Sequence, residues 1–311
     1  MEIRYITKID IETILDRHNI KYQSICPFPK SGQKAVFKII CDPNPIILKI
    51  YNVTPYHTIN QMEYVSHVDV DELKVQKNEE IRILTMIIAR EVKASKKCPI
   101  FPKMIITKDI DEYRVNEHLY KYYFEELVDG ITMNESSYYL EENSISQIAY
   151  FLDAALELVK KMWDKTYVHR DIKPNNIIID GERVMFIDPG LAKSANDETL
   201  TRTGMAMGTP RYWAPEQQEI QSNYNWTFKT DLYPLGLIAI EMFLPELRRL
   251  SEDQLKDMQF VYKKWCEKDQ FDKSKSFFRD IIVKLSAEKI FRRASSIEDI
   301  QKTLVEFKES D

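Results

Sequence analysis

The sequence predicts an α+β protein in two parts, a small antiparallel sheet with one main helix followed by a larger, mainly helical region. Its 311 residues exceed the roughly 250–300 at which one hydrophobic core stops growing. Short strand-like runs separated by turns precede residue 128, and apolar residues at helical spacing dominate after it. We therefore expect two lobes, residues 1–128 and 129–311, with residues 1–20 as an N-terminal extension.

The first part is predicted to be a sheet because apolar runs alternate with turn formers. Ser31-Gly32 and the Pro-Asn-Pro sequence at 43–45 separate the runs between Tyr22 and Tyr51. The expected elements are strands over 22–29, 35–41, 46–51, 104–107 and 120–127 and one helix over 71–90. The helix is indicated by apolar residues at helical spacing, Leu73, Ile81, Leu84 and Ile88.

The second part begins at the turn former pair Asp129-Gly130. Ser144 followed by Gln147 is typical of a capping box and predicts a helix whose apolar face runs from Ile145 to Met162. Further helical patterns are expected over 232–244, 252–266, 274–285 and 296–308. This region should therefore be mainly helical.

Composition excludes several classes of function. The net charge is −5 and the basic residues are dispersed, so nucleic acid is not expected as the main partner. The four cysteines, Cys26, Cys41, Cys98 and Cys266, lack the paired spacing of a zinc site and are expected to be reduced thiols. The longest apolar run, around 235–244, is shorter than the ~18 residues of a membrane span. We therefore expect a cytoplasmic protein with no membrane partner.

One constellation of residues indicates phosphoryl transfer. The segment His169-Arg170-Asp171 precedes Asn176, and Asp188 follows twelve positions later, after a short apolar run. Transfer from ATP needs a carboxylate that orients the attacking hydroxyl, together with oxygen ligands for a metal. Each fragment alone would more often be a surface turn, since Asp, Asn, Pro and Gly are common turn formers. Their order and spacing together favour the catalytic interpretation.

These residues resemble the signature motifs of the eukaryotic-like serine/threonine protein kinases of bacteria, and the resemblance extends along nearly the whole chain. It implies a bilobal protein-kinase fold. It also implies that Asp171 is the catalytic base, that Lys173 contacts the transferred phosphate, and that Asn176 and Asp188 bind the metal. Thr209 would hydrogen-bond Asp171 and help to form the acceptor site.

In the first lobe the resemblance implies an ATP-binding set. Lys49 matches the strand lysine that holds the phosphates, and Glu80 fits its helical ion-pair partner better than Glu79. Without the resemblance, these side chains would be read as ordinary solvated charges. The remaining ATP-binding residues are Gly32 and Val36 in the phosphate-covering loop, and Glu126 and Val128 in the hinge, whose backbone groups would hydrogen-bond adenine.

Structural and regulatory residues follow from the same motifs. His169 and Arg170 directly precede the base. Asp231 is expected at the start of the next helix, and Arg293 is expected to pair with Glu216. Thr201 and Thr203 match threonines that such bacterial kinases autophosphorylate. A phosphate there adds about −1.5 to −2 charge, which Arg170 could pair with. The alternative for these threonines is a polar loop without a regulatory role.

The chain departs from the family pattern at five places, one of which is Ile47, where a small alanine is expected over adenine. Pro29, Ser31 and Lys34 stand where the phosphate-covering loop usually has glycines, so that Gly32 alone remains and Lys34 could replace backbone contacts with charge. Pro189 replaces a phenylalanine of the metal-binding triplet. Glu125 falls at the gate behind adenine, where an apolar side chain is common. The segment 51–77 is longer than usual.

The resemblance implies a serine/threonine protein kinase that transfers the γ-phosphate of ATP to protein hydroxyls and phosphorylates its own activation segment. ATP with Mg²⁺ or Mn²⁺ would be the cofactors, a Ser/Thr-containing protein the substrate, and self-association would serve trans-autophosphorylation. One alternative is a pseudokinase scaffold or nucleotide-binding module with little transfer activity. Another is a small-molecule phosphotransferase, a class that lacks the segment from Gly208-Thr209-Pro210 to Ala214-Pro215-Glu216.

Overall fold

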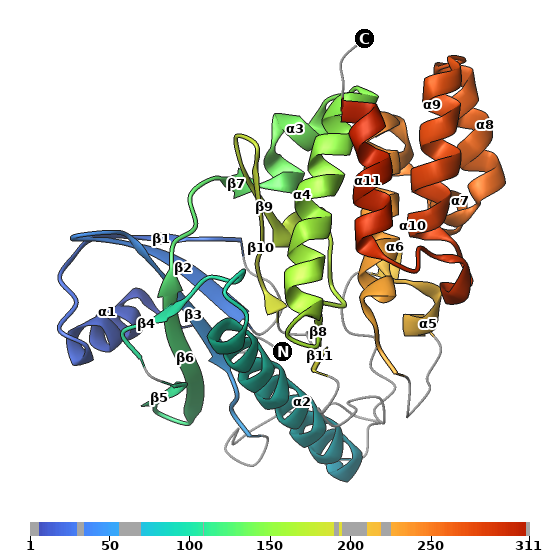
Figure 1. Cartoon of the computed structure of the whole chain (residues 1–311). Coiled ribbons are helices and arrows are strands. Elements are labelled where there is room, and N and C mark those ends of the chain that lie inside the picture. The colour runs from blue at the N-terminus through green and yellow to red at the C-terminus, as the bar shows by residue number, and fades with distance from the viewer. Residues whose placement is uncertain are drawn as a thin grey trace. The chain divides into compact units, whose positions relative to one another are not determined.

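The computed structural model divides the chain into two compact units, Met1–Val128 and Asp129–Asp311. It describes residues 6–29, 34–55, 70–107, 109–189, 193–194, 210–218 and 225–308, with backbone only for 70–73 and 193–194. The first unit is built on an antiparallel sheet and the second is mainly helical (Figure 1). The predicted α+β class is thereby confirmed.

The sheet of the first unit has the strand order β1-β2-β3-β6-β4. Strand β4 pairs with the C-terminal part of β6, and β5 pairs with its N-terminal part, residues 118–122. The strands are β1 (Tyr22–Pro27), β2 (Lys34–Cys41), β3 (Ile46–Asn52), β4 (Met104–Ile105), β5 (Asp111–Val115) and β6 (His118–Glu126). Of these, β5 was not predicted, because its polar sequence Asp-Glu-Tyr-Arg-Val lacks an apolar run. Strands β3 and β6 lie inside the sheet and carry most of its buried side chains.

One face of this sheet packs on helix α1 (Lys8–Arg17), which lies within the predicted N-terminal extension. Thr7 and Asp10 form a capping box at its start, and Ile14 and Leu15 are fully buried. They join the core formed by one face of β2, β3 and β6, including Leu48. The extension is therefore an integral part of the first unit.

The opposite face of the sheet packs on helix α2 (Val70–Lys97). Its residues Ile88 and Val92 form a buried cluster with Tyr51 and Tyr123 of the sheet. Figure 1 shows α2 as the long teal helix beside β3 and β6. The helix ends at Lys97, whereas the sequence predicted an end at residue 90, and this extension determines which of its carboxylates faces the sheet.

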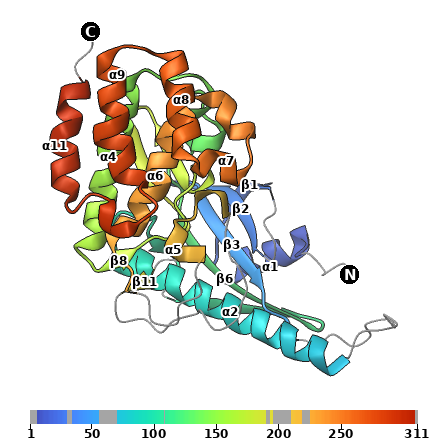
Figure 2. The ribbon, with the colours of Figure 1, turned by 90° about the vertical axis from the view of Figure 1, so that its right-hand side faces the viewer.

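Helix α4 lies at the core of the second unit, where it packs against α6 and α11 (Figure 2). The helices are α3 (Ser137–Leu140), α4 (Ile145–Trp163), α5 (Pro215–Gln218), α6 (Phe228–Phe243), α7 (Glu252–Lys256), α8 (Met258–Lys268), α9 (Asp272–Phe277), α10 (Val283–Ser286) and α11 (Ile297–Lys308). The capping box predicted at Ser144 and Gln147 is confirmed. Short strands complete the unit: β7 (Ile131–Thr132), β8 (Tyr167–Val168), β9 (Ile177–Asp180), β10 (Arg183–Phe186) and β11 (Lys193–Ser194).

Three helical predictions need correction. Helix α6 begins at Phe228, so Asp231 lies in its first turn rather than at its start. The stretch predicted over 252–266 is two helices, because Asp257 ends α7 and caps α8 with its side chain. The stretch over 274–285 contains a π-helical turn, Phe278–Ile282, between α9 and α10.

Within the described part of the chain, no helix is both long and apolar enough to cross a bilayer.

Candidate functional site

The loop between β8 and β9 is organised around the buried ring of His169. Its Nδ1 accepts the backbone N–H of Asp171 at 3.3 Å, and its Nε2 lies 3.2 Å from the carbonyl oxygen of Ile187. These contacts fix the tautomer, because Nδ1 must accept and Nε2–H must donate. Burial lowers the pKa of His169 to about 4. The ring is therefore neutral at neutral pH and connects the loop to the strand end that precedes Asp188.

The same loop is attached to α6 through Asp231. The backbone N–H groups of His169 and Arg170 donate to its two carboxylate oxygens at 2.7 and 2.8 Å. Arg170 has a φ of 67°, a left-handed conformation that costs a non-glycine residue roughly 1–2 kcal/mol. Burial raises the pKa of Asp231 to about 7, and the two N–H donors counteract that rise. These bonds hold the residue before Asp171 in its strained conformation.

Asp171 is held by two side chains that follow it in the loop. Lys173 Nζ and Asn176 Nδ2 lie 2.9 and 2.8 Å from the same oxygen, Asp171 Oδ2. Burial raises the pKa of Asp171, while the two donors counteract the rise. Among the residues that the structure describes, none donates to the other oxygen, Oδ1. Oδ1 is therefore the atom that can accept a hydrogen bond from an approaching hydroxyl.

Asn176 and Asp188 supply oxygen atoms suited to a metal ion. The Asn176 side-chain nitrogen donates to the Asp171 carbonyl and carboxylate, which leaves its Oδ1 as a ligand. The Ile187 N–H donates to the Asn176 carbonyl at 3.0 Å and so brings the start of the Asp188 segment to the loop. Mg²⁺ prefers such oxygens and usually needs only one or two carboxylates from the protein. Within the described ranges, no cluster of three or more His, Cys, Asp or Glu side chains could hold a metal.

In the first unit, Lys49 pairs with Glu91 rather than with Glu80. Lys49 Nζ lies 2.6 Å from Glu91 Oε1, and both side chains are almost completely buried. The Tyr51 hydroxyl donates to Glu91 Oε2 at 2.6 Å, so both oxygens of this carboxylate have a partner. The predicted Glu80 instead contacts Lys77 at 3.2 Å on α2.

The error has a geometric cause. Glu80 and Glu91 are eleven residues apart, which is about three helical turns, so they share a face but lie roughly 16 Å apart along the axis. The helix was expected to end at residue 90, so Glu91 lay outside it and only Glu79 and Glu80 were compared. The apolar spacing continues past that point, since Ile88 and Val92 are both buried, and it could have identified Glu91.

Two departures from the family pattern lie beside this pair. Glu125 on β6 is buried, and its Oε1 is 2.9 Å from Lys49 Nζ. Lys34, the first residue of β2, has its amine 3.8 Å from Glu91 Oε1. The ion pair between strand and helix therefore belongs to a charge cluster that also includes Lys34 and Glu125.

The other residues assigned to ATP binding are placed as follows. Val36 is directly opposite Lys49 in the β2–β3 register. Glu126 ends β6, and its backbone N–H donates to the Lys103 carbonyl at 2.9 Å, so that proton is engaged within the first unit. Val128 is the last residue of this unit. Gly32, Thr201, Thr203 and Thr209 lie outside the described residues.

The expected ion pair between Glu216 and Arg293 is present and buried. Two guanidinium nitrogens of Arg293 lie 2.7 and 2.8 Å from the two oxygens of Glu216. Arg293 also donates to the carbonyls of Ala287 and Lys229. This bidentate pair attaches α5, where the segment after residue 210 ends, to the loop that precedes α11.

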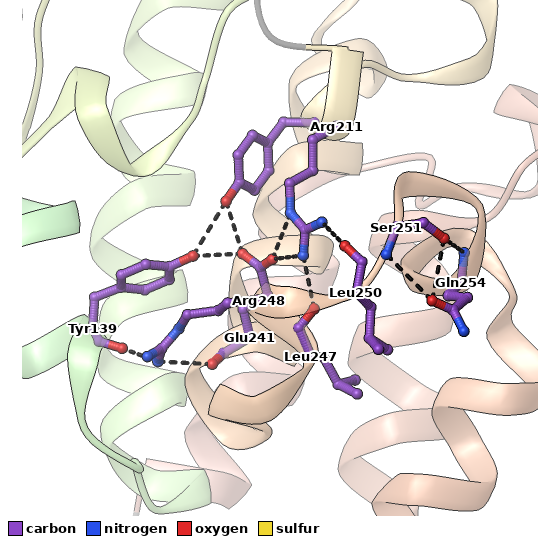
Figure 3. Close-up of polar contacts among 9 residues, drawn as sticks. Tyr139, Arg211, Glu241, Leu247, Arg248, Leu250, Ser251 and Gln254 are labelled. Carbon is purple, nitrogen blue, oxygen red and sulfur yellow. Dashed lines mark hydrogen bonds and ion pairs between the residues drawn. The ribbon is translucent and has the colours of Figure 1, made fainter.

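A second buried network fixes the same segment and was not predicted (Figure 3). Glu241 on α6 is fully buried and accepts from Arg211 Nε and Nη2 at 2.9 and 2.6 Å. The hydroxyls of Tyr139 and Tyr212 donate to its other oxygen. A lone glutamate inside the apolar sequence Leu-Ile-Ala-Ile-Glu-Met-Phe-Leu was the available signal, because a buried carboxylate requires partners.

The comparisons with known proteins agree with this arrangement. The family model described as "Protein kinase domain" matches residues 57–305. The chain belongs to the protein kinase domain family. The matched range includes Glu91 and the loop of Asp171, whereas Lys49 precedes it and is placed by the sheet.

Several curated kinases share segments with this protein kinase domain. It is 51% identical over 76 residues to the probable serine/threonine-protein kinase pknA2 of Bifidobacterium longum, covering 24% of this chain and 10% of that protein. It is 45% identical over 76 residues to PknA of Corynebacterium glutamicum, covering 24% and 16%. It is 26% identical over 151 residues to PknB of Lactococcus lactis, covering 47% and 22%. The matched part is therefore less than a quarter of each of these relatives.

Proposed function

We propose that this chain is an active protein kinase that transfers the γ-phosphate of ATP to serine or threonine hydroxyls of proteins. The observation that carries this proposal is the arrangement of Asp171. Its Oδ2 accepts hydrogen bonds from Lys173 and Asn176, while none of the described residues donates to its Oδ1. A general base needs such an oxygen, held in place by its neighbours and open to the hydroxyl. The buried Lys49–Glu91 pair supplies the second element that a protein kinase requires.

Each residue has a specific task in this proposal. Asp171 Oδ1 orients the acceptor hydroxyl and takes its proton as the oxygen–phosphorus bond forms. Lys173, already beside Asp171, supplies positive charge where the transferred phosphate accumulates negative charge. Asn176 and Asp188 would hold Mg²⁺ or Mn²⁺, which neutralises phosphate charge when bound. Lys49 would bind the phosphates of ATP, with Glu91 fixing the position of its amine.

The preference for serine and threonine is supported by Lys173 and by the relatives. Resemblance assigns this lysine to serine/threonine kinases, and its ion pair with Asp171 Oδ2 at 2.9 Å keeps it beside the proposed base. The names of the similar bacterial proteins PknA and PknB include serine/threonine-protein kinase. Protein substrates are proposed on the same grounds.

A kinase assay with γ-labelled ATP tests the proposal directly. Asp171→Asn keeps the shape of the side chain but removes the base, so we expect turnover to fall by about two to four orders of magnitude. The matched control is Asp180→Asn, which alters an exposed aspartate at the end of β9 and should leave turnover unchanged. Wild-type protein that binds MgATP but labels no protein would instead favour a pseudokinase, and labelling of a metabolite alone would favour a small-molecule phosphotransferase.

Autophosphorylation of Thr201 or Thr203 is a separate part of the proposal. Arg170 is the cation proposed to pair with the phosphate, and its guanidinium lies 4.2 Å from the centre of the Trp226 ring. Its backbone is held by Asp231 on one side and by the Gln217 side chain on the other. Phosphopeptide mass spectrometry of wild type and Asp171→Asn should find phosphate on one of these threonines in the wild type alone. Unmodified threonines in active enzyme would contradict this part without affecting the catalytic assignment.

A further inference from the structure

Two departures from the kinase pattern, Lys34 and Glu125, meet in one charge cluster around Lys49 and Glu91. In sequence they are 91 positions apart, one at the start of β2 and the other near the end of β6. Lys34 replaces a glycine of the phosphate-covering loop, and Glu125 replaces an apolar gate residue. Their meeting suggests that the two departures have one explanation.

The strand register places these side chains on the same face of the sheet. Directly paired residues of antiparallel strands project to one face, as do residues two positions apart in a strand. Lys34 is opposite Tyr51, which is two positions from Lys49. Ile47, two positions before Lys49, is opposite Glu125. The two lysines and the gate glutamate therefore share the face that packs on α2.

The distances show that both lysines use the same acceptor. Lys34 Nζ is 3.8 Å from Glu91 Oε1, and Lys49 Nζ is 2.6 Å from that same atom. The two amines can therefore be no further apart than these distances combined. Lys34 is 18% exposed and Lys49 only 4%, so Lys34 lies at the solvent side of the cluster. An anion approaching from solvent would therefore meet Lys34 first, with the amine of Lys49 behind it.

Lys34 and Glu125 add opposite charges to this cluster. Lys34 places a positive charge beside Glu91, and Glu125 places a negative charge beside Lys49. Buried charges are tolerated when they are paired, so each of these two residues offsets the charge that the other introduces.

We propose that Lys34 is a second phosphate-binding cation, which replaces the backbone N–H groups that a glycine-rich loop offers to a nucleotide. Glu125 is the positioning residue that holds Lys49 while Glu91 is shared by both amines. The ligand is the phosphate chain of a nucleoside di- or triphosphate, since a lysine amine contacts phosphate oxygens as a compact point charge. This proposal rests on the proposed function and specifies how its ATP-binding residues work.

Binding of MgATP, MgADP and adenosine by titration calorimetry tests the role of Lys34. Lys34→Met should weaken binding of MgATP by about ten- to a hundredfold, as expected for loss of one charged contact. Adenosine, which has no phosphate, should bind within about twofold of wild type, and Lys34→Arg should retain most of the MgATP affinity. Lys121→Met on β6, whose amine pairs with Glu112 at 3.5 Å, is the matched control and should bind MgATP normally.

The outcomes separate this proposal from the proposed function. Unchanged MgATP affinity in Lys34→Met, or an equal loss of adenosine binding, would overturn the role of Lys34 even in an active kinase. A wild-type protein that binds MgATP through Lys34 without transferring phosphate would remove the proposed function and retain this inference. Wild-type protein that binds no nucleotide would overturn both.

A thermal double-mutant cycle tests the role of Glu125. Lys34→Met removes a positive charge from the cluster and Glu125→Gln removes a negative charge, whereas the double variant has the same net charge as wild type. We expect the double variant to melt at a higher temperature than the sum of the two single shifts predicts, because neighbouring charges are coupled. Shifts that add within error would show that the two residues do not compensate each other.

Discussion

Replacement of Arg293 by Met should destabilise the second unit more than any exposed charge substitution. The side chain of Arg293 is fully buried and donates two hydrogen bonds to Glu216, at 2.7 and 2.8 Å. Its removal leaves a buried carboxylate without its counter-ion and also removes donors from the Ala287 and Lys229 carbonyls. Breaking a buried pair in this way costs about 3–5 kcal/mol. For a unit of this size, that corresponds to a fall in melting temperature of roughly 6–20 °C.

Thermal unfolding followed by circular dichroism measures this effect. Lys302→Met is the control, because Lys302 is 80% exposed and its amine is 3.9 Å from Asp299. An exposed pair of this kind contributes about 0–1 kcal/mol, so the control should melt within roughly 4 °C of wild type. A double variant with Glu216→Gln should recover part of the loss, because it removes the uncompensated charge. Equal melting temperatures for Arg293→Met and Lys302→Met would refute the reasoning.

Three further predictions follow from the contacts. Glu91→Gln should lower kcat/KM for ATP by about ten- to a hundredfold, because a charged hydrogen bond to Lys49 is lost. Glu80→Gln should change kcat/KM by less than about twofold. Equal effects of the two variants in a steady-state assay would restore Glu80 as the partner of Lys49. His169 has a folded pKa of about 4 against 6.5 for the free side chain, so its contribution to stability is complete above pH 6.5 and is lost as pH falls toward 4. The stability advantage of wild type over His169→Phe should therefore shrink by about 3 kcal/mol between pH 7 and pH 4 in urea titrations, and a constant difference would contradict the buried neutral ring. Arg211→Ala should destabilise the protein by about 3 kcal/mol, because it leaves the fully buried Glu241 carboxylate without its cation. Arg248→Ala is the comparison, since Arg248 donates to the backbone carbonyl of Glu241 and not to its carboxylate. A melting temperature within about 2 °C of wild type for Arg211→Ala would contradict this prediction.

Sequence reasoning located the parts of the site that depend on local structure. Asp171, Lys173 and Asn176 lie within six positions, and a single short loop brings their side chains together. The capping box at the start of α4 is equally local, since its two residues are three positions apart. Such contacts are specified by spacing alone, so a motif is sufficient to predict them.

Contacts that depend on element length or on distant pairing were harder to predict. The choice of Glu80 failed because the pairing residue depends on how far α2 continues and which turn faces β3. Arg211 and Glu241 are 30 positions apart, and nothing in either local sequence identifies the other as its partner. Helix α1 carries an ordinary amphipathic pattern, but only the sheet shows that Ile14 and Leu15 have a surface to cover.

The distribution of buried charge distinguishes residues that stabilise the fold from residues that serve catalysis. A buried ion pair is seldom more stabilising than well-packed apolar side chains of the same volume, so its retention needs another reason. Glu216 and Arg293 have such a reason in architecture, because the guanidinium also donates to the backbone carbonyls of Ala287 and Lys229 and so connects separate segments. Lys49 pairs with the carboxylates of Glu91 and Glu125, beside an apolar cluster that could have been continued through its position. Fold stability alone does not explain a lysine there, whereas a requirement to present a fixed positive charge to a phosphate does.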